Sequence, residues 1–364
     1  MRFDHLELSP TADFHVHLRD GAMAETVTPL IKQGGANIVY VMPNLTPPIT
    51  TVAAAVAYRD RLQALAPDIK FLMTLYLHPS ITPETITEAA ISGIAGVKAY
   101  PAGVTTNSQA GVLDWQQFYP VFEAMQTHDL VLNLHGEVPG TASPDDEDDV
   151  TVLTAEALFM PTLYKIHKEF PKLRIVLEHC TTRDALKAVQ SCGPTVGATI
   201  TAHHLWMTVD DWCGDVFNFC KPVAKTKFDR IALLKAVVDG GNGKFFFGSD
   251  SAPHPLSAKQ GGRKAAAGCF TQGWATQLVI GALGEGIKRG WIPEKDVSVQ
   301  ALENFLSRNG KRFYHIPEAE FHEGQKIILE KTGERISDVV QSTDKSIKVV
   351  PFKSGDEILS LRWA

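Results

Sequence analysis

The sequence lacks the features that would mark a secreted or membrane-spanning protein. Its 364 residues include only five cysteines, and no two of them form a Cys-x-x-Cys pair. Such scattered cysteines are typical of a reducing compartment and not of a disulfide scaffold. No apolar run approaches the roughly 18 residues of a membrane span, and Met1-Arg2-Phe3-Asp4 shows neither a signal-peptide core nor a basic presequence. We therefore expect a cytoplasmic protein without a membrane partner.

An excess of positive charge is missing as well. The formal net charge is −6, whereas a nucleic-acid surface needs clustered Lys and Arg. We expect no nucleic-acid partner, but a small anionic substrate stays open, because a local site can be positive on an acidic protein. The composition, 44% hydrophobic and 21% charged, is that of a globular protein with a large core.

The chain alternates between apolar, β-rich runs and segments with apolar residues at helical spacing. Helical spacing occurs, for example, over residues 25–33, 53–65, 151–170 and 228–239. The apolar runs are nearly continuous, as in parallel strands buried on both faces. They cover residues 11–18, 36–43, 69–77, 94–100, 130–135, 173–179, 195–202 and 244–250.

Eight strand–helix units predict an α/β fold, specifically a closed (β/α)8 TIM barrel. An open doubly wound sheet is the alternative, but the Gly-rich phosphate turn that usually follows its first strand is absent here. After about Lys311 the pattern changes to short segments. We expect a single domain, with the barrel over residues 1–310 and a short C-terminal extension over residues 311–364 packed on it.

The end of the first predicted strand carries His15-Val16-His17. Alternate residues of a strand point to the same face, so the two imidazoles form a chelating pair suited to zinc and its neighbours. Arg19 adds a cation that can hold a carboxylate or phosphate bidentately. Alone, the pair could be a chance match, since short motifs occur by accident.

Other ligand-type residues fall at the ends of further predicted strands. In TIM barrels, catalytic groups come from the C-terminal ends of several strands. Four histidines, one aspartate and one lysine exceed the needs of one tetrahedral zinc and suit two metals that share a hydroxide. These six residues are His15, His17, Lys98, His135, His179 and Asp250; Asn44 ends a further strand, and His254 lies close behind Asp250 in the sequence.

Lys98 allows three interpretations. It could be a substrate-binding cation or a Schiff-base nucleophile. It could also react with carbon dioxide to give a carbamate whose two oxygens bridge both metals. Charge balance favours the carbamate, because two divalent cations repel an ammonium.

With these motifs in order, the chain resembles the compact, stand-alone class of the dihydroorotases, within the amidohydrolase superfamily, from about residue 10 to the C-terminus. The segments that carry the resemblance are Asp13-Phe14-His15-Val16-His17-Leu18-Arg19-Asp20, Val41-Met42-Pro43-Asn44-Leu45, Gly96-Val97-Lys98-Ala99-Tyr100-Pro101, His135-Gly136-Glu137, Glu178-His179 and Gly248-Ser249-Asp250-Ser251-Ala252-Pro253-His254.

The resemblance implies a zinc-dependent cyclic amide hydrolase with two Zn²⁺ per subunit. His15, His17 and Asp250 would bind one zinc, and His135 and His179 the other. Carbamylated Lys98 (N6-carboxylysine) and a hydroxide would bridge the two ions.

The implied reaction is the reversible cyclisation of N-carbamoyl-L-aspartate to (S)-dihydroorotate with loss of water. This is the third step of de novo pyrimidine (UMP) biosynthesis. Asp250 would be the general acid and base, and the enzyme would be a homodimer.

The resemblance also implies substrate contacts. The free carboxylate would be held by Arg19, Asn44 and His254. Thr105 and Thr106 would belong to a mobile loop that closes over the substrate. Lys221 and Ala267 occupy positions that contact the pyrimidine ring, although Lys221 replaces the leucine expected in bacterial members, which puts its side-chain role in doubt.

Three other functions compete with this one. Dihydropyrimidinases, hydantoinases and allantoinases share the metal ligands, but the set of Arg19, Asn44 and His254 favours a carboxylated substrate. A non-catalytic barrel would lose metal ligands, and all are present here. A Schiff-base aldolase built on Lys98 would not need four histidines at the rim.

The remaining histidines and an acidic run carry weaker signals. We expect packing or surface roles for His78, His128, His167, His315 and His322, whereas the position of His203-His204 leaves open whether either reaches the site. The run from Asp145 to Asp149 precedes a helix expected near Val150. We interpret this run as a solvated, helix-capping loop, because it lacks the EF-hand spacing of a calcium site.

Overall fold

The computed structural model describes residues 5–140, 150–260, 262, 264–317 and 324–364. Its centre is an eight-stranded parallel sheet in which every strand pairs with the next one along the chain. The ends of the sheet meet, because Asp250 N–H donates to His15 O (2.8 Å) and His17 N–H donates to Ser251 O (3.0 Å). The strands are β2 (Thr11–Val16), β3 (Ala36–Val41), β4 (Lys70–Tyr76), β5 (Gly96–Ala99), β6 (Val131–His135), β7 (Ile175–Glu178), β8 (Val196–Ile200) and β9 (Phe245–Phe247).

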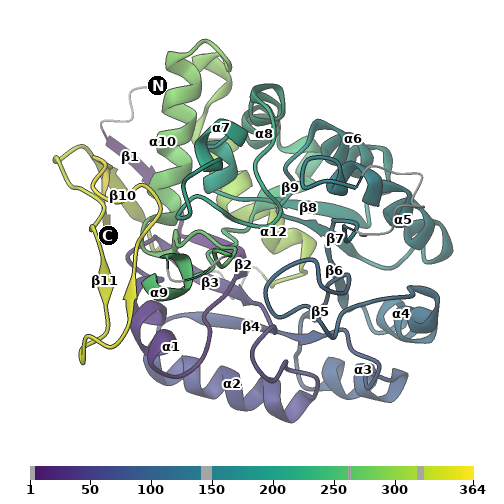
Figure 1. Ribbon diagram of the computed structural model, residues 1–364. Helices are drawn as coiled ribbons and strands as arrows, with labels where there is room; N and C mark the ends of the chain where they lie inside the picture. The colour runs from purple at the N-terminus through teal and green to yellow at the C-terminus, as the bar shows by residue number, and fades with distance from the viewer. Residues whose placement is uncertain (1–4, 141–149, 261, 263, 318–323) are drawn as a thin grey trace.

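Helices lie outside this ring of strands, so the predicted TIM barrel is confirmed (Figure 1). Over the described residues, no helix is both long and apolar enough to cross a membrane. The α-helices are α1 (Gly21–Val27), α2 (Val52–Leu65), α3 (Pro83–Ile91), α4 (Tyr119–Thr127), α5 (Ala155–Glu169), α6 (Arg183–Ser191), α7 (Val209–Trp212), α8 (Lys227–Asp239), α9 (Leu256–Gln260), α10 (Ala275–Lys288), α11 (Val299–Glu303) and α12 (Asn309–Phe313). A π-helical segment, Asn304–Arg308, connects α11 to α12.

The barrel interior is filled by an apolar cluster drawn from strands all around the ring. Phe14 of β2, Tyr40 of β3 and Phe246 of β9 meet there with Tyr314, which follows α12. Such a cluster can form only inside the ring of strands. It therefore supports the side chains that lie at the rim of the barrel. The outward faces of the same strands join the larger core under the helices.

A local irregularity in β2 allows this short strand to place side chains both in the barrel interior and at the rim. The register between β2 and β3 shifts between Asp13 and Val16, as at a β-bulge, which re-aims side chains near active sites. Phe14 therefore packs in the interior cluster, while His15 and His17 both face the cavity described below.

The C-terminal extension forms a small sheet beside the barrel, and the N-terminus contributes to it. β1 (His5–Leu8) pairs antiparallel with β10 (Ile327–Glu330), which pairs with β13 (Ser360–Trp363) (Figure 1). A two-stranded ribbon, β11 (Val340–Gln341) and β12 (Lys348–Val349), completes the extension. The pairing of β1 was not predicted, and the division between residues 310 and 311 stays a prediction.

Two helix boundaries differ from the expected ones. The helix expected over 25–33 is α1, which ends at Val27, followed by a 3₁₀ turn at 28–30 that contains Pro29; proline removes a backbone donor and disfavours a continuous α-helix. The helix expected near Val150 begins at Ala155. Thr151 and Thr154 instead exchange side-chain hydrogen bonds with nearby backbone, which competes with helix formation. The acidic run at 145–149 and His322 lie outside the described residues.

Candidate active site

A narrow cavity opens at the carboxyl ends of the barrel strands. Every site residue predicted from the sequence lines it except Lys98 and His254, which lie next to it. The lining residues are His15, His17, Arg19, Asn44, Tyr100, Thr105, Thr106, His135, His179, Lys221, Asp250, Ala252, Ala267 and Gly268.

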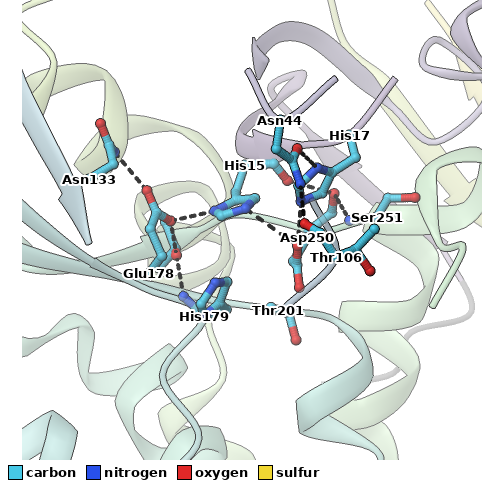
Figure 2. A network of polar contacts seen from close by, with 12 residues as sticks. His15, His17, Asn44, Thr106, Asn133, Glu178, His179, Thr201, Asp250 and Ser251 are labelled. Atoms are coloured by element: carbon cyan, nitrogen blue, oxygen red, sulfur yellow. Dashed lines mark hydrogen bonds and ion pairs between the residues drawn. The ribbon is translucent and has the colours of Figure 1, made fainter. Parts of the chain in front are cut away.

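Three metal-ligating groups converge on one side of this cavity. Asp250 Oδ1 lies 3.1 Å from Nε2 of His17 and 3.4 Å from Nε2 of His15. One ligand atom from each residue lies within 4.8 Å of the others, and all three side chains are buried. Figure 2 shows His15 between Glu178 on one side and Asp250 on the other.

The other nitrogens of these two imidazoles are already engaged. His15 Nδ1 lies 2.7 Å from Glu178 Oε2, and His17 Nδ1 lies 2.8 Å from Asn44 Oδ1. Both oxygens are acceptors, so each Nδ1 carries the proton and each Nε2 keeps a lone pair. Two lone pairs and a carboxylate oxygen therefore face one another, an arrangement that a shared cation stabilises and that fits a metal ion.

A second pair of imidazoles lies on the adjacent strands. His135 Nε2 lies 2.8 Å from Glu137 Oε2, which leaves Nδ1 available to the cavity. The ring centroids of His135 and His179 are 4.7 Å apart, and those of His179 and His15 are 5.0 Å apart. Nδ1 of His179 is buried and has no hydrogen-bond partner among the residues that the structure describes. This pair is close enough to the first group to share a bridging ligand with it.

Lys98 of β5 lies near both groups, since its charge acts on His15 of one and on His135 of the other. Its side chain is fully buried, and Nζ makes no hydrogen bond within the described residues. Burial lowers the pKa of Lys98 to about 8. A buried amine without a partner is costly, and a carbamate group on Nζ would supply the oxygens that two cations need.

The electrostatics keep the imidazoles in the form that binds metal. Burial lowers the pKa of His15, His17, His135 and His179, so these rings are held neutral. Burial raises the pKa of Asp250, and nearby His15 and Lys98 oppose that rise. Nitrogen and oxygen donors of this kind suit zinc, and the donor set therefore fits the two ions that the sequence predicts.

The predicted carboxylate-binding residues form a second group on the rim. Arg19 places Nη2 3.2 Å from His254 Nε2 and donates from Nε to Pro253 O (3.1 Å). His254 Nε2 also lies 2.9 Å from Ala267 O. Burial and the neighbouring Arg19 lower the pKa of His254 to about 3, so Arg19 supplies the positive charge in this group.

The loop that contains Thr105 and Thr106 lies over the same edge of the cavity as Arg19. Asn44 Nδ2 donates to Thr106 O (3.2 Å), and Asn107 Nδ2 donates to Asn44 O (3.0 Å). Thr105 N–H donates to Ser108 Oγ (2.9 Å). Asn44 thus contacts both His17 and this loop.

Lys221 and Ala267 line the cavity from two further loops, as the resemblance implies. Neither His203 nor His204 lines it; His204 instead contacts Thr201 Oγ1 (2.8 Å) and Pro222 O (2.9 Å). His78, His128, His167 and His315 are exposed or half-buried and lie away from the cavity.

Two of the ligand residues have backbone conformations that non-glycine residues rarely adopt. His179 has φ 43° and Asp250 has φ 44°, and such left-handed residues cluster at functional sites. Gly248 allows β9 to approach β2 closely, because an added Cβ would lie 2.9 Å from His15 Cβ. Backbone geometry thus helps to place these ligands.

Sequence reasoning missed the groups that hold the ligands in place. Glu178 accepts from Asn133 Nδ2 (2.6 Å) and Thr199 Oγ1 (2.5 Å) in addition to His15. Asn133 in turn contacts the hydroxyl groups of Tyr40 (2.6 Å) and Tyr314 (2.7 Å). Glu178 and Glu137 belong to the quoted motifs, so the carboxylates next to His179 and His135 in the sequence were the available signal.

Comparisons with known proteins give one consistent result. A probable dihydroorotase of Schizosaccharomyces pombe is 47% identical over 358 residues, covering 98% of this chain and 98% of the relative. A crystal structure of dihydroorotase from Saccharomyces cerevisiae in complex with 5-fluoroorotic acid superposes with a TM-score of 0.91 at 45% identity, covering 99% of both chains.

An L-hydantoinase (dihydropyrimidinase) from Arthrobacter aurescens shares the fold alone, with a TM-score of 0.78 at 16% identity over 98% of this chain and 82% of that one. No protein-family model matches the chain.

Proposed function

The chain belongs to the dihydroorotase family, and from this premise we propose how its residues interconvert N-carbamoyl-L-aspartate and (S)-dihydroorotate. This reaction is a step of pyrimidine biosynthesis and makes the chain a cyclic amide hydrolase. The observation that carries the proposal is the convergence of two imidazole lone pairs and Asp250 near the buried amine of Lys98.

We propose that His15, His17 and Asp250 hold one Zn²⁺, that His135 and His179 hold a second, and that carbamylated Lys98 bridges them. Zinc held by these residues would make hydroxide available near neutral pH and would polarise the carbonyl that is attacked. The second contacts of the ligands support this assignment, because Glu178, Asn44 and Glu137 orient the rings of His15, His17 and His135.

Substrate recognition in this proposal depends on Arg19. Its guanidinium would hold the carboxylate that does not react, with Asn44 and His254 completing the contact. The ligand of the Saccharomyces cerevisiae dihydroorotase structure, 5-fluoroorotic acid, is a carboxylated pyrimidine, which supports a cationic contact at this place. Hydantoin and dihydrouracil lack this carboxylate, so they would bind more weakly.

Asp250 is the residue we assign to proton transfer. Its Oδ1 faces the two imidazoles, which leaves Oδ2 to take a proton from the attacking water and deliver it to the departing ring nitrogen. In the synthetic direction the same oxygen would remove the ureido proton.

The loop with Thr105 and Thr106 would close over the bound substrate and exclude water. Lys221 and Ala267 would contact the pyrimidine ring from the opposite loops. From the resemblance we also expect a cytoplasmic homodimer.

Steady-state kinetics with three substrates test this function. The purified protein should hydrolyse dihydroorotate and show little activity on hydantoin or dihydrouracil. Arg19→Gln should lose most of the preference for dihydroorotate. Efficient hydrolysis of hydantoin but not of dihydroorotate by the wild type would overturn the proposal.

A reconstitution experiment tests the carbamate. Metal-free protein should regain activity with Zn²⁺ and bicarbonate, and much less with Zn²⁺ in bicarbonate-free buffer. Equal recovery in both buffers would remove the carbamate from the proposal.

A further inference from the structure

A second group of metal-ligating side chains lies beside the catalytic cavity. It consists of His203 in the 3₁₀ turn after β8, Cys220 and Cys269. One ligand atom from each lies within 4.8 Å of the others. The three side chains are 0%, 1% and 1% exposed, respectively. None of these residues has a part in the proposed reaction.

The imidazole of His203 makes no hydrogen bond within the described residues, on either ring nitrogen. A neutral imidazole has one donor and one acceptor, and leaving such buried groups unpaired destabilises the fold. Its neighbour His204 is different, because both of its nitrogens have oxygen partners. His203 therefore requires an explanation that ordinary packing does not supply.

The two thiols are close to each other and to this ring. Cys220 Sγ lies 3.3 Å from Pro222 O, and Cys269 Sγ lies 3.6 Å from Phe217 O. The ammonium of Lys259 is held next to them by Gly268 O (2.8 Å) and two other carbonyls. The neighbouring Cys269 and burial raise the pKa of the Cys220 thiol, and the positive charge of Lys259 partly opposes this rise.

We propose that His203, Cys220 and Cys269 bind one thiophilic metal ion of the zinc class, at a third site separate from the two catalytic ions. Thiolate and imidazole ligands select such ions. On binding, a divalent ion forms two metal–sulfur bonds and one metal–nitrogen bond, and each thiol releases its proton to solvent. Two thiolates neutralise the ion, which suits a fully buried site.

The position of this site gives it a structural role in catalysis. Cys220 directly precedes Lys221, and Cys269 follows Ala267 by two positions. A metal ion would tie together the two loops that line the catalytic cavity with these residues. This role, unlike the metal site itself, rests on the proposed function.

A titration of the reduced holoenzyme with Cd²⁺ tests the site. The catalytic ligand set contains no sulfur, so an ultraviolet sulfur-to-cadmium absorption band reports on cysteine ligands alone. We expect one Cd²⁺ per chain to produce the band, with release of about two protons per ion where the site is empty, or of one Zn²⁺ where zinc already occupies it. Cys220→Ser and Cys269→Ser should lose the band, and His203→Gln should weaken binding at least tenfold.

Two controls separate this result from other causes. Cys213→Ser removes the exposed thiol and should leave the band unchanged, and Lys98→Ala should retain it although its catalytic site is impaired. In the wild type, bound Cd²⁺ should protect Cys220 and Cys269 from alkylation, as mapped by mass spectrometry. This measurement does not depend on the folding of any variant.

The proposal is overturned if the wild type gives no sulfur-to-cadmium band, if the band depends on Cys213, or if both buried thiols are alkylated equally with and without Cd²⁺. A disulfide between Cys220 and Cys269 that persists in the reduced holoenzyme would also overturn it. None of these outcomes depends on dihydroorotate turnover, so they leave the proposed function to its own test.

Discussion

Replacing Glu178 with Gln should weaken zinc binding without unfolding the barrel. Oε2 of Glu178 accepts from His15 Nδ1 (2.7 Å) and Oε1 accepts from Asn133 Nδ2 (2.6 Å). A glutamine has an NH₂ group in place of one of these oxygens, so it must face one donor with another. The isosteric change leaves volume and packing nearly unaltered.

Asn133 cannot turn to relieve this conflict. Its Oδ1 accepts from the hydroxyl of Tyr40 (2.6 Å), and its Nδ2 also contacts the hydroxyl of Tyr314 (2.7 Å). One buried donor is therefore left unpaired, which costs about 1–3 kcal/mol. If the unpaired donor is His15 Nδ1, the ligand loses its orientation, and metal affinity should fall by about 10–100-fold.

Zinc-buffered equilibration followed by metal analysis measures this change. Glu178→Gln should need about 10–100-fold more free zinc for half-maximal activity, and saturating zinc should restore much of the rate. Glu123→Gln is the matched control, because Glu123 is an exposed residue of α4. Wild-type zinc affinity in a folded Glu178→Gln protein would refute the reasoning.

Three further predictions follow from individual residues and from the reaction. Arg19→Gln should raise KM for dihydroorotate about 10–100-fold, the value of a lost charged hydrogen bond, and an unchanged KM in steady-state assays would contradict its role. Burial raises the pKa of Glu156 from 4.5 to about 7, so stability present below pH 4.5 is lost as pH rises through 7. Glu156→Gln should remove about 3 kcal/mol of that loss in urea unfolding. If the free energy of unfolding of the variant depends on pH as that of the wild type does, this result would count against a buried charge at Glu156. Ring closure consumes one proton, so the equilibrium ratio of carbamoyl aspartate to dihydroorotate should rise about tenfold per pH unit, and a pH-independent ratio by chromatography would exclude this substrate pair.

The sequence predicted the barrel because its strands are buried on both faces and therefore read as continuous apolar runs. The ends of those runs placed His15, His135, His179 and Asp250 on one rim, and the structure brings them around one cavity. The same reasoning could not predict how deeply Lys98 is buried, since its burial depends on side chains from neighbouring strands.

Long-range contacts account for what the sequence did not predict. Tyr314 reaches Asn133 from beyond α12, and β1 pairs with β10 across almost the whole chain. Neither contact has a periodic pattern, because each depends on how distant segments meet. His203, like Tyr314, could be interpreted only when its neighbours in space were known.

The left-handed backbone of Asp250 also opposes local preference. Its φ of 44° is costly for a non-glycine residue, so propensity would not place it there. The hydrogen bond from its N–H to His15 O (2.8 Å), which joins the two ends of the sheet, holds this conformation. Barrel closure and ligand placement are therefore coupled at one residue.

The most direct test of the central claim compares zinc content and dihydroorotate turnover in the wild type and Lys98→Ala. If Lys98 bridges two catalytic ions, the wild type should bind two more zinc ions per chain than the variant, whatever is bound at the sulfur site. Turnover should be lost together with those ions. Equal zinc content, or full turnover in Lys98→Ala, would contradict the account.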